Sequence, residues 1–251
     1  MTTRIPETGR STSGKPAVGF LSANNRWGTH YDHFMAIVPD GIEVQIKGLG
    51  LYTKEITELA GKSDIQVAKT QEFAAENDWV GITLMGAPME VQNPGLAKRM
   101  RESVPVPVTT ALEAGAAALR SLGTRKALLL CPFDAPMKAK LQAHLRGEGV
   151  DVMLPEESFA TITDGAAQTA DQLYALAKAE LAKAPGVDAI YFQGAPMDPL
   201  AIVDRLEADL GVPVICSNPT MLWHITTKVG LKFSIPDKGR LLAEWPDAVP
   251  V

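Results

Sequence analysis

The chain has 251 residues, of which 46% are hydrophobic and 21% are charged, and its formal net charge is −5. This composition is that of an ordinary globular protein. Lys and Arg are scattered, so the basic stripe that nucleic-acid binding requires is missing. No apolar run approaches the roughly 20 residues of a membrane helix, and the first residues lack the apolar part of a signal peptide. The sequence therefore predicts a cytoplasmic protein without a nucleic-acid or membrane partner, and it is compatible with a homo-oligomer.

The predicted elements alternate between strands and helices. Residues 1–15 are polar and rich in Ser, Thr, Gly and Pro, which predicts a disordered tail. Short apolar runs predict strands at Ala17–Leu21, Ile42–Ile46, Val80–Leu84, Val106–Val108, Lys126–Leu130, Val150–Leu154, Ala189–Phe192 and Val212–Ile215. Helices are expected at Thr53–Glu76, Pro94–Glu102, Ala111–Leu122, Pro136–Arg146, Gly165–Ala182, Leu200–Leu210 and Thr220–Val229. This alternation predicts an α/β fold with parallel sheets flanked by helices.

One segment occurs twice. Gly-Ala-Pro-Met follows an apolar strand at residues 86–89 and again at residues 194–197, and the next residue is an acid each time, Glu90 and Asp198. The repeat predicts two related α/β halves, one of residues 16–110 with the C-terminal segment 219–251 and one of residues 111–218. Ligands bind outside the carboxyl ends of parallel strands, so we expect the active site in a cleft between the halves, lined by both copies.

Several further segments are informative together: Ser22–Asn25, Thr109–Ala114, Leu119–Gly123, Asp188–Gly194, Leu206–Asn218, Leu222–His224 and Lys238–Leu242. They resemble the Asp/Glu racemase superfamily, in its branch of maleate cis-trans isomerases and arylmalonate decarboxylases. The resemblance is most specific in the second half and covers roughly residues 17–245. It implies two Rossmann-like (flavodoxin-like) halves related by a pseudo-twofold axis, and cofactor-independent chemistry at the alpha carbon of a small carboxylate.

Glycine occupies both positions at which the resemblance implies a catalytic cysteine. Racemases and isomerases of the superfamily use two cysteines, one per half, and the decarboxylases keep only the second. Here these positions are Gly86 and Gly194. Neither two-thiol proton exchange nor thiolate addition to a double bond can run without them. A decarboxylase needs only donors for the enolate and one proton source, so we expect a lyase or a proton-shift (cis-trans) isomerase that forms an enolate-like intermediate.

The candidate substrate-binding residues lie after the predicted strands. Gly86 and Gly194 let the backbone approach a carboxylate, and the amides of Ala87 and Ala195 would donate to it. The alternative is that both glycines only make tight turns. The resemblance adds Asn25, Phe133 (where this branch has a tyrosine), Ser217 and Asn218, and it places Thr109 and Thr110 at the related position of the first half.

The candidate catalytic residues are acids and histidines. A shielded Glu90 or Asp198 could carry a proton, whereas the alternative is that each complements the helix after it, an interpretation favoured for Asp198. His30 and His33 could also transfer protons near neutral pH, or belong to a polar surface loop that runs into a short helix. Together with Asp32 they leave a metal-assisted hydrolase open, although their close spacing is weak support for a metal site.

A non-catalytic carboxylate-binding protein is the other alternative, because both nucleophiles are absent. Cys131 and Cys216 occupy no cysteine position of the superfamily and are expected to be small buried residues. His224, which lies beside Trp223 in a predicted helix, is expected to be structural.

Overall fold

The computed structural model describes residues 3–6, 9–156 and 159–249 of the chain. It divides into two compact units, Met1–Ala111 with Ile225–Leu231, and Leu112–His224 with Lys232–Val251. The first unit thus takes only a short part of the segment 219–251 that the sequence predicted for the first half. The remainder of that segment belongs to the second unit.

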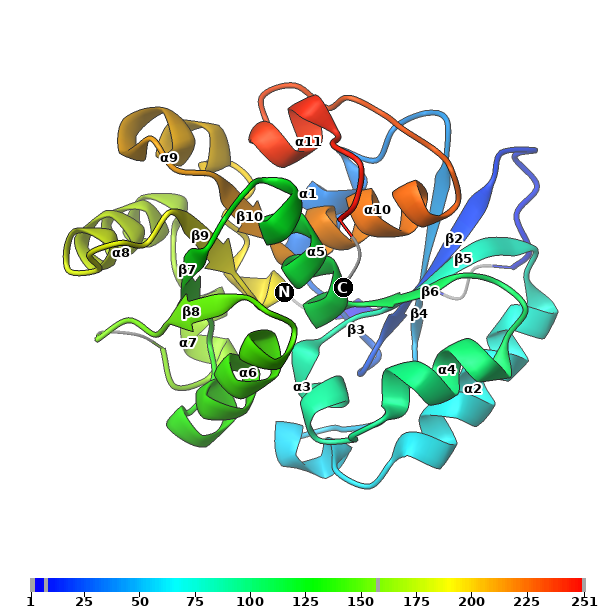
Figure 1. Cartoon of the computed structure of the whole chain (residues 1–251). Coiled ribbons are helices and arrows are strands. Elements are labelled where there is room, and N and C mark those ends of the chain that lie inside the picture. The colour runs from blue at the N-terminus through cyan, green and yellow to red at the C-terminus, as the bar shows by residue number, and fades with distance from the viewer. Residues whose placement is uncertain (1–2, 7–8, 157–158, 250–251) are drawn as a thin grey trace. The chain divides into compact units, whose positions relative to one another are not determined.

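The first unit contains a four-stranded parallel sheet (Figure 1). Its strand order is β4-β2-β5-β6. All six residues of β2 are buried, as expected of a strand covered on both faces. The strands are β2 (Ala17–Ser22), β4 (Glu43–Gly48), β5 (Trp79–Leu84) and β6 (Val108–Thr110).

The second unit contains the same arrangement. Its parallel sheet has the order β8-β7-β9-β10, which matches the first sheet strand for strand along the chain. The predicted α/β fold with two related parallel sheets is thereby confirmed. The strands are β7 (Lys126–Leu130), β8 (Asp151–Met153), β9 (Ala189–Phe192) and β10 (Val214–Cys216).

Two predicted helices are divided. The region 53–76 forms η1 and α2, separated by Gly61 with a φ of 71°. The region 165–182 forms the end of α7 and then α8, because Thr169 and Gln172 make a capping box that starts a new helix. The helices of the first unit are α1 (Thr29–Met35), η1 (Ile56–Leu59), α2 (Ser63–Glu76), α3 (Ala87–Val91) and α4 (Leu96–Ser103). Those that follow are α5 (Ala111–Ser121), α6 (Ala135–Gly147), α7 (Ile162–Ala166), α8 (Ala170–Ala182), η2 (Ala195–Met197), α9 (Val203–Leu210), α10 (Ser217–Lys228) and α11 (Arg240–Glu244).

Two helices carry the chain from one unit to the other. Helix α5 follows β6 but packs on β9, where a Cβ at Gly115 would lie 2.5 Å from the Tyr191 hydroxyl. The last residues of α10, which follows β10, belong to the first unit, and a Cβ at Gly81 would lie 2.9 Å from Ile225 Cδ1. Small residues in the facing positions let these crossover helices pack closely on the strands.

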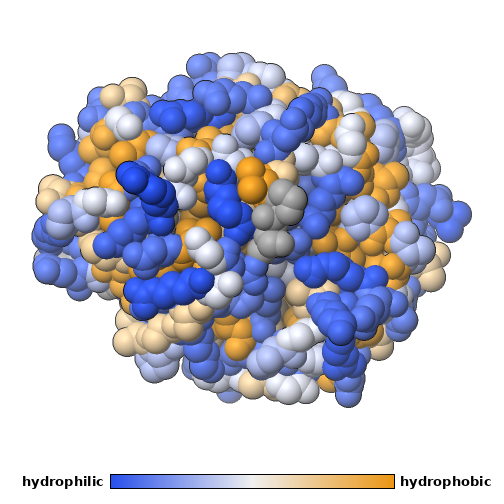
Figure 2. Space-filling model, in the orientation of Figure 1, coloured by the Kyte–Doolittle hydropathy of each residue, from blue (hydrophilic) through white to orange (hydrophobic). Residues whose placement is uncertain are grey.

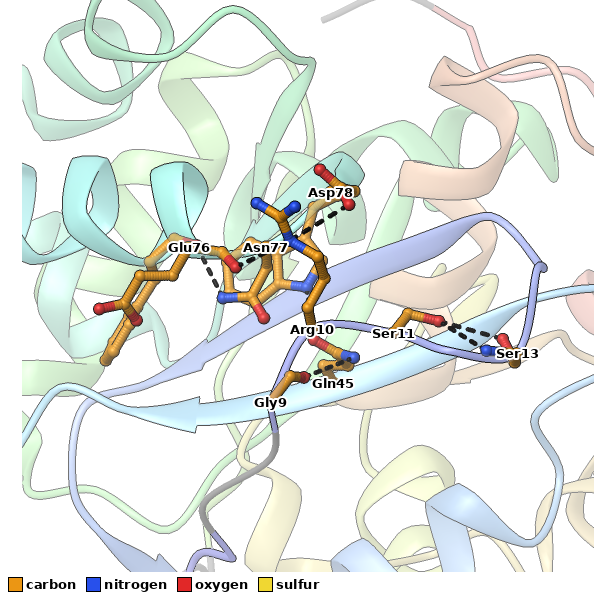
Figure 3. Close-up of polar contacts among 10 residues, drawn as sticks. Gly9, Arg10, Ser11, Ser13, Gln45, Glu76, Asn77 and Asp78 are labelled. Atoms are coloured by element: carbon orange, nitrogen blue, oxygen red, sulfur yellow. Dashed lines mark hydrogen bonds and ion pairs between the residues drawn. The ribbon is translucent and has the colours of Figure 1, made fainter.

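The described residues of the N-terminal segment are bound to the first unit, where the sequence predicted a disordered tail. Strand β1 (Thr3–Arg4) pairs with β3 (Arg26–Trp27) in antiparallel orientation. Arg10 lies 3.3 Å from the Asp78 carboxylate, and Gln45 Nε2 donates to the Gly9 carbonyl at 3.3 Å (Figure 3). The hydroxyls of Ser11 and Ser13 donate to Glu43 at 2.6 and 2.7 Å. A polar segment can therefore be ordered through hydrogen bonds rather than apolar burial.

The face drawn in Figure 2 is mostly hydrophilic, with hydrophobic residues scattered over it. Among the residues that the structure describes, the exposed large hydrophobic side chains are Ile65, Val80 and Val249. None of the described helices is both long and apolar enough to span a membrane. The homo-oligomer and the cytoplasmic location stay predictions from the sequence.

Candidate functional site

The two Gly-Ala-Pro-Met segments form the same kind of turn at the same place in each sheet. Gly86 follows β5 with φ 94° and ψ 101°, and Gly194 follows β9 with φ 130° and ψ 94°. In each turn the Met amide donates to the Gly carbonyl, at 3.0 Å in both. Positive φ values of this kind are accessible to glycine and strained for other residues. Both glycines are therefore required by the backbone, whether or not they also approach a ligand.

Each turn leaves one main-chain donor available. The proline at the second position has no N–H, and the methionine N–H is already used inside the turn. The amides of Ala87 and Ala195 have no acceptor among the described residues, as is usual for the first amides of a helix. These are the two amides that the sequence analysis predicted as carboxylate donors.

The two turns differ in the space beside the glycine. A Cβ added at Gly86 would meet no atom within 4 Å. A Cβ at Gly194 would lie 2.6 Å from Pro132 Cδ and 4.0 Å from Phe133 Cζ. Pro132 therefore occupies the space that a side chain at position 194 would need.

Ser217 lies beside Gly194, and Phe133 faces the same position. The Gly194 amide donates to Ser217 Oγ at 2.8 Å, and Ser217 begins α10 directly after β10. The structure thus brings three predicted substrate-binding residues together, at the carboxyl ends of β7, β9 and β10. Because Ser217 Oγ accepts this bond, its own O–H remains able to donate.

Two buried carboxamides flank this group. Asn218 is 4% exposed, and its Oδ1 has no hydrogen-bond partner among the described residues. Gln193 is 1% exposed, and its Oε1 also has no such partner. Gln193 is not among the residues that the sequence predicted for the site. Its position next to Gly194 was visible, but its burial without a partner follows only from the packing.

Asn25 belongs to the first unit. A Cβ at Gly50 would lie 3.0 Å from Asn25 Nδ2, so the side chain covers the turn after β4. Asn24, its neighbour, donates to the Tyr52 hydroxyl at 2.9 Å. The substrate-binding role of Asn25 stays a prediction.

His30 and His33 belong to α1, a short helix of the kind that was expected after the polar loop. His30 is half-buried against Tyr31, with ring centroids 4.2 Å apart, whereas His33 and Asp32 are exposed. Burial lowers the pKa of His30 to about 4, with a smaller opposing effect from Asp32 and a further lowering by His33. His30 is therefore neutral at pH 7, where it can accept a proton or a hydrogen bond.

His30, Asp32 and His33 do not gather into a metal site. Asp32 instead accepts a hydrogen bond from Trp27 Nε1 at 2.8 Å. Within the described part of the chain, no three His, Cys, Asp or Glu side chains form a group that could hold a metal ion. The metal-assisted hydrolase therefore has no ligand set in these residues.

The low pKa of His30 makes stability depend on pH. As the pH falls, His30 takes up a proton near its ordinary pKa of 6.5 in the unfolded chain, but only near a pKa of about 4 in the folded chain. Between these pH values protonation favours the unfolded chain, so the stability that neutral His30 supplies is lost as the pH falls from 6.5 to 4. We expect His30→Gln to flatten this part of the stability profile, as measured by urea unfolding at several pH values. Thr29→Ser, a non-titrating substitution at an exposed position of the same helix, is the control and should keep the pH slope of the wild type. Equal slopes for the wild type and His30→Gln would contradict the assignment.

The matched acids differ in conformation. Glu90 is half-buried on α3, and Asp198 follows η2 with a φ of 45°. Helix α9 starts at Val203 with Ile202 as its N-cap, so the interpretation that Asp198 caps the following helix is wrong. The chain turns through Pro199–Ile202 before the helix begins. Left-handed backbone at a non-glycine residue is uncommon and is enriched at functional sites.

Both cysteines are buried, at 1% exposure for Cys131 and 6% for Cys216. Burial raises the pKa of Cys131 to about 12 and also raises that of Cys216, to which the nearby Asp198 carboxylate contributes. Such thiols are inert at neutral pH, in agreement with the expectation of small buried residues. His224 is 4% exposed and stacks on Trp223 with ring centroids 5.6 Å apart, which fits a structural role.

Comparisons with known proteins agree with this fold. The arylmalonate decarboxylase family matches residues 33–242 of the chain. A liganded arylmalonate decarboxylase carrying a Gly-to-Cys and a Cys-to-Ser substitution has a TM-score of 0.78 and 21% identity, over 92% of this chain and 100% of that one. Maleate isomerase Iso of Pseudomonas putida S16 with maleate has a TM-score of 0.72 and 19% identity, over 91% of this chain and 97% of that one. A Nocardia farcinica maleate cis-trans isomerase mutant with a covalently bound succinylcysteine intermediate has a TM-score of 0.75 and 22% identity, over 92% of this chain and 99% of that one. No curated protein sequence matches the chain.

Proposed function

Because the chain belongs to the arylmalonate decarboxylase family, we propose that it is a cofactor-independent enzyme acting at the alpha carbon of a small carboxylate. The reaction is a decarboxylation or a proton-shift isomerisation that passes through an enolate-like intermediate. The observation that carries the proposal is the group of hydrogen-bond donors that follow β9 and β10. Both strands lie within the residues that match the family. No thiol takes part.

The donors suit a developing enolate. The Ala195 amide is available, and the Ser217 hydroxyl, held by the Gly194 amide at 2.8 Å, can donate in the same region. Donors fixed before the reaction stabilise negative charge on oxygen without reorganising, and each contributes on the order of 10²–10³-fold in rate. Ala87 offers the corresponding amide in the first unit.

The proton carriers that we propose are Glu90 and Asp198, with His30 as an acceptor. A neutral imidazole with a pKa of about 4 takes up a proton poorly and holds it briefly at pH 7, so it can relay a proton but cannot store one. A carboxylic acid in a shielded site can both give and receive a proton. His33 completes the proposed set, although its exposure makes it the least shielded member.

A carboxylate-binding protein without catalysis is the second candidate. Pro132 fills the space beside Gly194, so the packing leaves no room for a side chain at this position. The same donors would bind a carboxylate without turning it over.

Turnover distinguishes the two candidates. The purified full-length chain is incubated in D₂O with substituted malonates and with unsaturated diacids, with and without a chelator, and followed by NMR. We expect loss of a carboxylate, or a double-bond shift, with deuterium at the alpha carbon and no effect of the chelator. Binding of these acids without any conversion would favour the binding protein. Conversion that the chelator abolishes would contradict cofactor-independent chemistry.

A further inference from the structure

Gln193 is placed at the proposed site by the central strand of the second sheet. It follows Phe192, the last residue of β9, and its amide donates to the Leu130 carbonyl of β7 at 2.8 Å. Phe192 pairs with Cys216 in the parallel register, so Gln193 is level with Ser217. The residue after it is Gly194, whose amide bonds Ser217.

The carboxamide oxygen of Gln193 is buried and has no hydrogen-bond partner among the described residues. The residue is 1% exposed, and Oε1 has no hydrogen bond to a described residue. A buried polar atom in this state costs about 1–3 kcal/mol, and native proteins keep few of them. Asn218 presents a second such oxygen at the start of α10, on the other side of Ser217 in the sequence. Gln193 and Asn218 therefore each place one unpartnered carboxamide oxygen next in sequence to the donors of the proposed site.

The charge of this region indicates what the carboxamides bind. The segments from Tyr191 to Pro199 and from Pro213 to His224 contain no Lys or Arg. A second carboxylate bound here would have no cation from these segments. A carboxamide offers a donor and an acceptor without charge, which complements a hydroxyl or an amide.

We propose that Gln193 is a specificity-determining residue that contacts the substrate and, with Asn218, binds an uncharged polar substituent on the alpha carbon, a hydroxyl or a carboxamide. The inference rests on the proposed function, which places the substrate carboxylate at the Ala195 amide and the Ser217 hydroxyl. It goes beyond that function by naming the substituent and the residue that selects it. A substrate of this kind supplies the hydrogen bonds that the two carboxamides lack.

The test compares two diacids that differ only in the substituent. Hydroxymalonate carries a hydroxyl where methylmalonate carries a methyl group. Calorimetry gives the Kd of both for the wild type, Gln193→Met and Gln66→Met. Gln66 is a buried glutamine of α2 in the first unit, at 0% exposure, and neither its carboxamide oxygen nor its nitrogen has a partner among the described residues. Met keeps the length of Gln and removes the unpartnered atoms, so both variants should fold.

We expect the wild type to bind hydroxymalonate about 10-fold more tightly than methylmalonate, since one hydrogen bond to a buried group contributes about that much. Gln193→Met should reduce this preference to about 1, and Gln66→Met should leave it unchanged. A preference that survives in Gln193→Met, equal binding of both diacids by the wild type, or binding of neither overturns the proposal. If Gln193→Met loses the preference for hydroxymalonate but no acid is turned over, the specificity role of Gln193 stands and the proposed catalysis is wrong. If malonates are turned over but Gln193→Met keeps the preference, the proposed catalysis stands and the specificity role is wrong.

Discussion

Gly194→Cys is expected to destabilise the chain by about 3–5 kcal/mol, whereas Gly86→Cys should cost about 1–3 kcal/mol. Both glycines have a positive φ, so both variants carry backbone strain. Only position 194 adds a clash, because its Cβ would lie 2.6 Å from Pro132 Cδ on a rigid ring. Urea unfolding of the two variants measures the difference. Equal losses would mean that Pro132 moves aside and that the space beside Gly194 is not closed.

The new thiols also report on the site. The Gly86→Cys thiol has open space around it and starts a helix, so it should react with a small alkylating agent faster than Cys131 and Cys216, which are buried. A bound malonate should protect it if Gly86 lines the carboxylate site. A reactive thiol that no carboxylate protects would mean that the turn at Gly86 is structural and that the site lies elsewhere.

Ser217→Ala is expected to reduce kcat/KM by about 10²–10³-fold, the usual effect of removing one donor to a developing oxyanion. The substitution also removes the acceptor of the part-buried Gly194 amide, which costs about 1 kcal/mol. The rate should therefore fall at temperatures where the variant is still fully folded. Circular dichroism establishes folding, and initial rates with the best malonate give kcat/KM.

Ser121→Ala is the matched control for this variant. Ser121 Oγ also accepts a backbone amide, that of Val249, at 2.9 Å, but it lies at the end of α5. We expect its kcat/KM to equal that of the wild type. A Ser217→Ala protein that is destabilised but fully active would show that Ser217 only supports the Gly194 turn, and the enolate donor would then have to be sought elsewhere.

Local sequence patterns determined most of the fold. Lys126–Leu130 and Ala189–Phe192 are strands over the predicted residues, because runs of buried apolar residues between turn signals have few other conformations. The repeat of Gly-Ala-Pro-Met correctly indicated two related sheets. The limits of other elements were less predictable. Thr169 divides a predicted helix through a cap that competes with the continuous pattern, and residues 9–15 are ordered by hydrogen bonds to distant residues.

For the site, the sequence by itself determined which residues follow the strands and that no cysteine stands at Gly86 or Gly194. It could not determine which of these residues meet, since that depends on side chains from separate strands. The tertiary structure decided that Ser217 bonds Gly194, that Pro132 closes the space beside Gly194, and that Ile202 rather than Asp198 is the N-cap of α9. It also decided that Gln193 is buried without a partner and that the pKa of His30 falls to about 4. Burial and contact between residues far apart in the chain are properties of packing, which a pattern of neighbouring residues does not contain.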